Sequence, residues 1–239
     1  MTQQQPSDPT QAFAELGRIK LGETDLNGVL TRVAELARDT IPGANEVSVT
    51  LVRPRGAHTA AFTGDLAVVL DEWQYEHGHG PCLVAAADAV PLSIADMATE
   101  TRWSQWAARA LEAGAGSSLS IGLPVHDAVT GALNVYSRES HSFDSDAILL
   151  AETFAGYAAV ALANAHLYDT TATLAQHMQA AMEHRAVIEQ AKGIVMAERR
   201  CTADEAFAIL TKVSQDSNRK LREVAMVLVE QAGRRPPSS

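Results

Sequence analysis

The chain has 239 residues, of which 46% are hydrophobic and 20% are charged, so it fits one ordinary domain and a second, smaller one. Its two cysteines, Cys82 and Cys201, lie far apart, which excludes a disulfide framework and a paired CxxC zinc signature. The first residues, MTQQQPSDPTQ, are polar and carry no basic residue. We therefore expect a disordered tail over residues 1–11, no secretion signal and a cytoplasmic protein.

Charge is distributed unevenly along the chain. Residues 1–183 contain 9 Lys and Arg against 22 Asp and Glu, a net charge of −13, whereas residues 184–239 contain 10 against 7, a net charge of +3. A basic segment at the end of an acidic chain indicates a polyanionic partner for that segment alone. Short helical domains are also often slightly basic, so charge by itself leaves both interpretations open.

In chain order, residues 12–40 show helical periodicity, and TDLNGVLTRVAELARDTI has Thr24 as a plausible N-cap. The segment EVSVTLVR alternates as a strand, and a second strand is expected near AAFTG. Short helices and loops follow, then the strand pair SSLSIGLPV and GALNVYSR, and a long helix that begins near Ser142 or Asp144. This order predicts an α+β domain over residues 12–165, with helices on one face of an antiparallel sheet.

The stretch GHGPCL and the strand segment IGLPVHDAVTGALNVYSR, taken with this order of elements, resemble a GAF domain over residues 20–165. The resemblance implies a sensory module with a small-molecule pocket between the sheet and the helical insertion. It does not identify the ligand.

Three residues of this insertion, Trp73, Tyr75 and Cys82, are candidates for lining the pocket, although such aromatic residues are more often part of a core. With His77 and His79, Cys82 also forms H-x-H-x-x-C, a possible metal or haem site that lacks a fourth ligand nearby. A redox role for Cys82 needs a neighbouring cation that the sequence does not supply, and a buried inert thiol is the alternative. We expect no metal and no cofactor.

The long helix is expected to continue without Pro or Gly through residues 166–183. Leu167, Leu174, Ala181 and Ile188 repeat every seven residues, which favours a parallel coiled coil and a homodimer over a helix packed on its own chain. The most apolar segment, LLAETFAGYAAVALANAHLY, is interrupted by polar side chains, so we expect no membrane span.

Residues 184–235 are predicted to form an all-α bundle of three helices joined by short turns. The second helix begins with a capping box formed by Thr202 and Glu205, and Phe207, Leu210 and Val213 give it an apolar stripe. Helix-turn-helix DNA readers share this outline, so topology alone does not identify the partner.

Basic residues gather at the start of the third helix, where we place Arg219, Lys220 and Arg222 in the first turn after an Asn218 cap. A helix N-terminus disfavours cations by about 0.3 to 1 kcal/mol each, so an external anion is expected to offset them. Free amide groups and basic side chains together suit a phosphate.

The first helix of this region carries a basic stripe that includes Arg185 and Lys192. Gly193 follows Lys192, although a glycine destabilises a helix by about 1 kcal/mol relative to alanine. Its missing side chain would let a backbone come close to Lys192, either of a nucleic acid or of a neighbouring helix.

The segments RAVIEQAKGIVM, CTADEAFAIL and NRKLREVA closely resemble the ANTAR domain, over residues 184–231. The resemblance implies a dimer that binds paired RNA stem-loops in a nascent transcript leader and prevents a terminator hairpin from forming. It assigns Ala191, Lys192 and Gly193 to the AKG surface, and Arg219 and Lys220 to the basic start of the last helix. We expect no aromatic residue on this face, so recognition would rely on hydrogen bonds and shape.

Three classes of function make different demands on these residues. A ligand-controlled RNA antiterminator accounts for the charge distribution and for both resemblances. The alternative is a DNA-binding regulator with a GAF sensor, although we expect no Asn or Gln on the outward face of the third helix to read bases. An enzyme is disfavoured, because the sequence has no nucleophile elbow, Gly-rich phosphate loop or HExxH motif.

Overall fold

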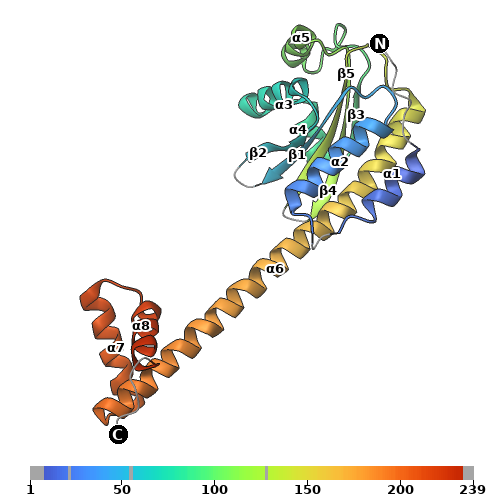
Figure 1. Ribbon diagram of the computed structural model, residues 1–239. Helices are drawn as coiled ribbons and strands as arrows, with labels where there is room; N and C mark the ends of the chain where they lie inside the picture. The colour runs from blue at the N-terminus through green and yellow to red at the C-terminus, as the bar shows by residue number, and fades with distance from the viewer. Residues whose placement is uncertain (1–7, 21–22, 54–55, 127–128, 234–239) are drawn as a thin grey trace. The chain divides into compact units, whose positions relative to one another are not determined.

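The computed structural model describes residues 8–20, 23–53, 56–126 and 129–233 (Figure 1). The chain divides into two compact units, residues 1–169 and residues 170–239. Helix α6 (Ser145–Arg199) contributes residues to both units. Residues 1–7 of the expected tail and residues 234–235 of the expected bundle lie outside the described residues.

The first unit is built on a five-stranded sheet in the order β2-β1-β5-β4-β3, with every neighbouring pair antiparallel. At its centre β1 pairs with β5 from Glu46 opposite Tyr136 to Val52 opposite Thr130. The strands are β1 (Glu46–Arg53), β2 (Gly56–Phe62), β3 (Pro91–Ile94), β4 (Ser117–His126) and β5 (Val129–Ser137).

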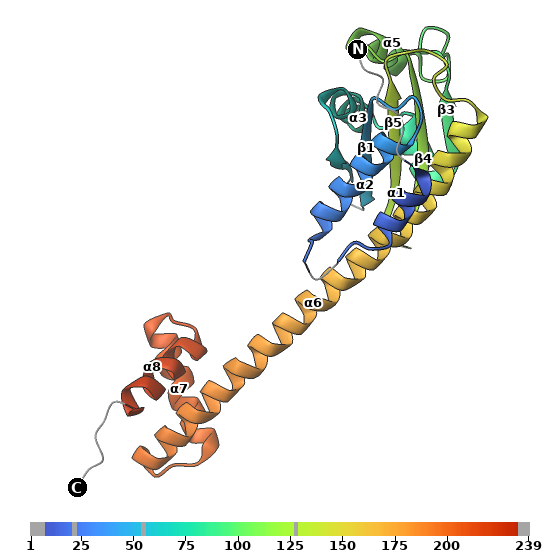
Figure 2. The same ribbon diagram turned by 45° about the vertical axis from the view of Figure 1, so that its right-hand side comes forward.

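One face of the sheet is apolar and is covered by α1 (Pro9–Leu16), α2 (Leu26–Thr40) and the first part of α6. Figures 1 and 2 both show these three helices side by side on that face. Val47, Val49 and Leu51 of β1 point into this core, as their alternation predicts.

The other face is also covered, so the prediction of helices on one face was wrong. Here α3 (Asp65–His77) and α4 (Pro81–Asp88) pack on the strands, and α5 (Ser104–Ala113) packs on α3. The strand residues on this face include Ser48, Thr50 and Asn134, which are polar yet fully buried. In the sequence, polar residues at these positions predict a solvent-exposed face, although the face is buried.

Three helix starts refine the predicted boundaries, and each is capped by an aspartate that accepts a backbone N–H. Asp8 accepts from Thr10 at 2.9 Å, so residues 9–11 are helical and the disordered tail was predicted too long. Asp25, and not Thr24, caps α2 by accepting from Gly28 at 2.8 Å. Asp144 accepts from Ala147 at 2.8 Å, which confirms the predicted start of α6.

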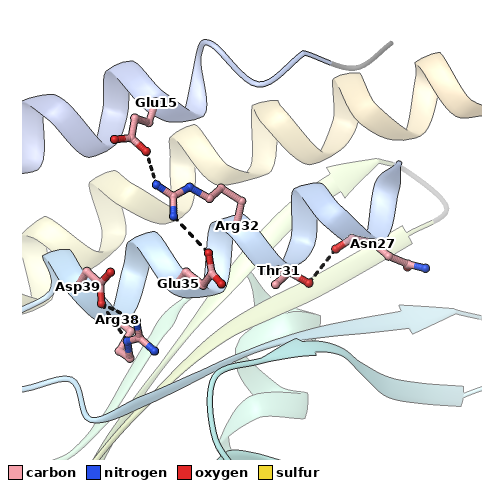
Figure 3. A network of polar contacts seen from close by, with 7 residues as sticks. All are labelled: Glu15, Asn27, Thr31, Arg32, Glu35, Arg38 and Asp39. Carbon is pink, nitrogen blue, oxygen red and sulfur yellow. Dashed lines mark hydrogen bonds and ion pairs between the residues drawn. The ribbon is translucent and has the colours of Figure 1, made fainter. Parts of the chain in front are cut away.

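Arg32 of α2 joins α1 to α2 (Figure 3). Its guanidinium donates to Glu15 of α1 and, at 3.2 Å, to Glu35 of α2, and the hydrogen bond to Glu15 is the main reason that the pKa of Arg32 is raised. Because these side chains are partly solvated, each ion pair contributes about 1 kcal/mol or less. The packing of Phe13 against Phe154, with ring centroids 6.2 Å apart, is the stronger constraint on α1.

The second unit is a three-helix bundle of the end of α6 with α7 (Ala203–Ser217) and α8 (Leu221–Gly233). The predicted capping box is confirmed, because Thr202 and Glu205 each accept from the other's backbone N–H. The predicted apolar stripe was wrong in part: Leu210 is buried, but Phe207 and Val213 are exposed. The buried residues of its core are three alanines, one valine and one leucine, with larger hydrophobic side chains only partly buried around them, and they are Ala191, Val195, Ala206, Leu210 and Ala225.

Helix α6 also satisfies the length and composition of a membrane span, with one 18-residue window of mean hydropathy 1.5. Of that window 39% is buried within the protein. Burial of this kind is what a core helix of the first unit requires, so the window by itself is weak evidence for a membrane.

Phe154 is fully buried in the first unit, whereas Phe62 is half-exposed at the end of β2. We expect Phe154→Ala to lower the free energy of unfolding by about 3 to 5 kcal/mol and Phe62→Ala by about 1 kcal/mol or less. Urea unfolding followed by tryptophan fluorescence measures both. Equal effects would contradict the placement of α6 against the sheet.

Candidate nucleic-acid interface and sensory site

Lys192 lies on α6 beside the core of the bundle and is not a freely solvated cation. Its Nζ lies 3.0 Å from a carboxylate oxygen of Glu189, one turn earlier, and its side chain is only 17% exposed. The preceding residue, Ala191, is fully buried. Of the predicted AKG surface, Ala191 therefore packs α6 against the bundle and does not lie on the surface.

Gly193 is exposed, and a Cβ built at this position meets nothing within 4 Å. Close packing of another helix of the same chain therefore does not explain the glycine. The explanation that remains is the close approach of a partner from outside the chain. That partner would reach the helix backbone next to Lys192.

The turn between α7 and α8 differs from the prediction. Asn218 has φ 51° and ends α7, with its N–H donated to Gln215, so it is the C-cap of α7 and not the N-cap of α8. Helix α8 begins at Leu221, and the carbonyl of Lys220 accepts the first N–H groups of its ladder. Only Arg222 of the three predicted cations lies in the first turn; Arg219 lies in the turn before it.

The cations of this turn differ in their partners. Arg219 lies 3.8 Å from Glu223 in a solvated ion pair, and Nη1 of Arg222 lies 3.2 Å from Nε2 of His184. The contact between Arg222 and His184 joins the start of α8 to α6. His184 directly precedes Arg185 in the sequence. Among the described residues Lys220 and Arg185 form no ion pair, so their charges are open to an external anion.

Sequence reasoning missed one feature of this bundle. Phe207 on α7 is 44% exposed, so an aromatic ring lies on the surface of the bundle, although no contact places it on the face of Lys192 and Gly193 for which none was expected. Other large apolar side chains are exposed with it, and these are Met196, Ile209, Val213, Met226 and Val227.

In the first unit, the predicted pocket residues fall into two places. Tyr75 and Cys82 face the polar side of the sheet, where the Tyr75 hydroxyl lies 2.8 Å from Thr50 Oγ1 and 3.0 Å from Thr59 Oγ1. Trp73 lies apart from them, with its ring stacked on His77 at a centroid distance of 3.8 Å.

The centre of the polar side is Asp71, which sequence reasoning also missed. Its carboxylate accepts from Tyr136 Oη at 2.6 Å, from Thr59 Oγ1 at 3.0 Å and from Asn134 Nδ2 at 3.3 Å. Burial raises the pKa of Asp71 to about 6, and the hydrogen bonds only partly oppose this rise. Helix α3 contains four acidic residues, and no sequence pattern indicates that Asp71 is the one that is buried.

Cys82 is fully buried, with Sγ 3.4 Å from Thr50 Oγ1. Burial, and after it the charge of Asp71, raises the pKa of the thiol, so the reactive thiolate is disfavoured. The H-x-H-x-x-C spacing does not bring three ligands together, and the described part of the chain contains no group of three His, Cys, Asp or Glu placed to hold a metal ion.

Two cavities are found in this unit, and neither is lined by Trp73, Tyr75 or Cys82. A cavity of about 210 Å³ lies between the end of α1 and α6. An open depression of about 510 Å³ lies over the charged residues Glu46, Asp65, Arg109 and Arg138. The polar side of the sheet is instead filled by its own hydrogen-bonded side chains.

Residues 23–163 match the GAF domain family, and residues 176–229 match the ANTAR domain family. The chain belongs to the GAF domain family and carries a C-terminal ANTAR domain. The polar side of the sheet under α3 and α4 is thus part of a GAF domain, and the AKG surface is part of an ANTAR domain. No curated protein matches the sequence.

Solved structures agree with the GAF fold. The phycocyanobilin-bound GAF domain of a cyanobacterial phytochrome is 17% identical, with 67% of this chain and 97% of that chain covered and a TM-score of 0.53. The reduced form of fRMsr of Staphylococcus aureus is 18% identical, with 68% and 99% covered and a TM-score of 0.52. At such identities the similarity establishes the fold alone.

The buried carboxyl of Asp71 predicts a pH dependence. Its pKa of about 6 lies above the ordinary value of 3.8, so the neutral form is favoured in the folded state. The resulting stability is complete below pH 3.8 and is lost as the pH rises through about 6. Relative to Asp71→Asn, we expect the parent chain to lose about 2 to 3 kcal/mol between about pH 4 and about pH 7.5.

Urea unfolding at a series of pH values measures this difference. Tyr136→Phe removes a hydrogen bond that stabilises the carboxylate, so it should move the loss to higher pH. A difference between parent and Asp71→Asn that stays constant with pH would contradict the assignment.

Proposed function

We propose that the protein is a regulator of transcription antitermination in the cytoplasm, in which the ANTAR domain binds RNA stem-loops of nascent mRNA leaders and the GAF domain senses a small molecule. The observation that carries the proposal is that the ANTAR match lies where the charge of the chain changes sign: residues 1–183 have a net charge of −13, and residues 184–239 have a net charge of +3. The match itself contains 8 Lys and Arg against 7 Asp and Glu, so it is the contrast with the acidic first part of the chain that directs an anionic polymer to the C-terminal part.

The proposed RNA-binding face consists of basic side chains of the bundle and the open backbone at Gly193. Its residues are Arg185, Lys192, Gly193, Arg219, Lys220 and Arg222. Phe207 adds an exposed ring, and an unpaired base of a loop stacks on such a ring with about 1 to 3 kcal/mol. Loop recognition therefore combines charge, backbone approach and stacking, which is a mode suited to hairpin RNA.

DNA recognition is the second candidate, and α8 would be its reading helix. Its exposed side chains after the first turn are Met226, Val227, Glu230 and Gln231, so the expectation of no Gln on this helix was wrong. Gln231 lies at the far end of α8, whereas helix-turn-helix proteins read bases from the start of the recognition helix. A gel shift with one hairpin pair supplied as RNA and as DNA decides between the two candidates.

Regulation and not catalysis is proposed for the GAF domain. The thiol of Cys82 is buried and its pKa is raised, so it is poorly suited to attack a substrate. The GAF domain is also proposed not to bind RNA, because its net negative charge repels phosphates.

The proposed assembly is a homodimer joined along α6. From Thr153 to Met182 the only charged residue is Asp169, although most of this segment after Asp169 is exposed. An exposed helix without charges is unusual in a solvated position. Leu174 of the seven-residue repeat is 59% exposed, and a second copy of α6 would cover it.

Lys192→Ala is expected to weaken binding of a paired-hairpin RNA by about 1 to 3 kcal/mol and to reduce the slope of log affinity against log salt by about one. Glu189→Gln should strengthen binding, because Glu189 neutralises part of the charge of Lys192. Lys212→Ala, exposed on α7 outside the proposed face, is the control. Equal losses from Lys192→Ala and Lys212→Ala would refute the assigned face.

Gly193→Ala separates folding from binding. Helix propensity predicts up to about 1 kcal/mol of added stability, since the new methyl group meets nothing in the chain. Close backbone approach predicts that RNA affinity is lost. A more stable protein with unchanged affinity would show that Gly193 does not contact RNA.

Leu174→Glu is expected to convert a dimer into a monomer, because it places like charges opposite each other in the repeat. Light scattering of the full chain at tens of micromolar gives the mass. Gln176→Glu, exposed outside the repeat, should leave the dimer intact. A parent chain that is monomeric at this concentration would refute the dimer.

A further inference from the structure

A histidine of α6 holds the guanidinium of Arg222 in the C-terminal bundle. Nη1 of Arg222 lies 3.2 Å from Nε2 of His184, and both residues are only partly exposed. A guanidinium has N–H donors and no acceptor, so the imidazole nitrogen must accept this hydrogen bond. His184 is therefore neutral in this contact, with its proton on Nδ1.

Arg222 differs from other cations of the proposed RNA-binding face in the charge of its partner. Lys192 is paired with Glu189, and Arg219 with Glu223, so carboxylates offset part of both charges. Among the described residues Arg222 forms no ion pair, and its partner is an uncharged ring. A neutral acceptor fixes the guanidinium without cancelling its charge, which leaves Arg222 attractive to an anion.

The contact joins the two helices that carry the proposed RNA-binding residues. His184 directly precedes Arg185 on α6. Arg222 lies in the first turn of α8, where backbone N–H groups without helical partners attract anions. A phosphate that approaches the start of α8 therefore reaches the guanidinium and the imidazole together, because the two are already in contact.

Arg222 is the charged group in contact with His184 among the described residues. On α6 the residues one turn away on the same side are uncharged, and they are Ala180, Ala181, Val187 and Ile188. On α8 the next carboxylate, Glu223, lies 3.8 Å from Arg219. The charged residues of α7 make no hydrogen bond or ion pair with His184 in the described bundle, and they are Asp204, Glu205, Lys212 and Asp216. A proton added at Nε2 would occupy the acceptor, so His184 becomes charged when Arg222 has another partner.

We propose that His184 belongs to the RNA-binding face and that RNA binds there with the uptake of one proton. A phosphate oxygen replaces Nε2 as the acceptor of Arg222, and a guanidinium binds two such oxygens in parallel. The freed Nε2 takes a proton from solvent and donates it in a hydrogen bond to the same phosphate. Histidine is the side chain that ordinarily changes charge between about pH 5 and 8, so RNA binds more tightly at the lower end of this range.

This inference rests on the proposed RNA binding and adds a contact residue and a dependence on pH. The test is fluorescence anisotropy of a labelled paired-hairpin RNA with the full chain, at constant salt, from about pH 7.5 to about pH 5.5. Uptake of one proton allows at most about a tenfold change in the dissociation constant per pH unit. We expect the parent to bind about tenfold more tightly at the lower pH, after division by the change that His184→Gln shows.

His184→Gln is the matched variant, because the glutamine carbonyl accepts from Arg222 but cannot take up a proton. It should keep the affinity of the parent at about pH 7.5 and lose the gain at lower pH. His177→Gln, exposed on α6 two turns before His184, is the control and should keep the pH profile of the parent. If His184 only joined α8 to α6, His184→Gln would keep that profile too.

Two further measurements separate this inference from the proposed function. Nitrogen NMR of the histidine rings gives the tautomer of His184 in the free chain, with the signal assigned by its loss in His184→Gln. We expect the proton on Nδ1 at about pH 7.5. Long-chain polyphosphate is the second probe, since it presents phosphates without a hairpin, and it should show the same difference between the parent and His184→Gln.

Two results would overturn the inference. They are a His184→Gln chain with the pH profile of the parent, and a free chain whose His184 carries its proton on Nε2. A chain that binds polyphosphate with this pH dependence but binds no hairpin RNA would refute the proposed function and support the phosphate site at His184 and Arg222. A chain that binds neither probe would refute both.

Discussion

One helix, α6, contributes to a hydrophobic core in each of the two units. The first part of α6 closes the apolar face of the sheet with Phe154 and Leu162, and its end supplies Ala191 and Val195 to the C-terminal bundle. A break in α6 would remove the closing element of either core, and proline is accordingly absent from it. Its two glycines, Gly156 and Gly193, both lie where a Cβ would meet nothing in the chain. At Gly193 this open backbone is where RNA is proposed to approach.

Much of the fold follows from periodicity. Alternation in EVSVTLVR located β1, and the pattern of Thr202 and Glu205 located the start of α7, because both rest on local geometry that a short segment determines. The second layer of helices could not be found in this way. It covers strand residues such as Thr50 and Asn134, which are buried only because Asp71 and Tyr75 of α3 hydrogen-bond to them. Burial that is made possible by long-range hydrogen bonds has no signature in the local sequence.

In the candidate sites too, some features were predictable from the sequence and others depend on packing. The basic side chains of the bundle were predictable because cations on a small helical domain are visible in composition. Their surroundings were not: Glu189 beside Lys192, the left-handed Asn218 and the exposed ring of Phe207 all depend on how the helices pack. In the GAF domain the sequence drew attention to aromatic residues and a thiol, whereas the most perturbed carboxyl, Asp71, is one of four acidic residues of its helix and differs from the others only in being buried against the sheet.

The small side chains at the centre of the bundle have a thermodynamic consequence. A core made mainly of alanine, with one valine and one leucine, removes little apolar surface from water, so the isolated bundle opens more readily than the GAF domain. Anything that binds only the closed form adds to its stability through mass action, by about 2.7 kcal/mol at a hundred times the dissociation constant. Binding of the proposed RNA would therefore protect the bundle from proteolysis, and it would link the lifetime of the chain to the abundance of that RNA.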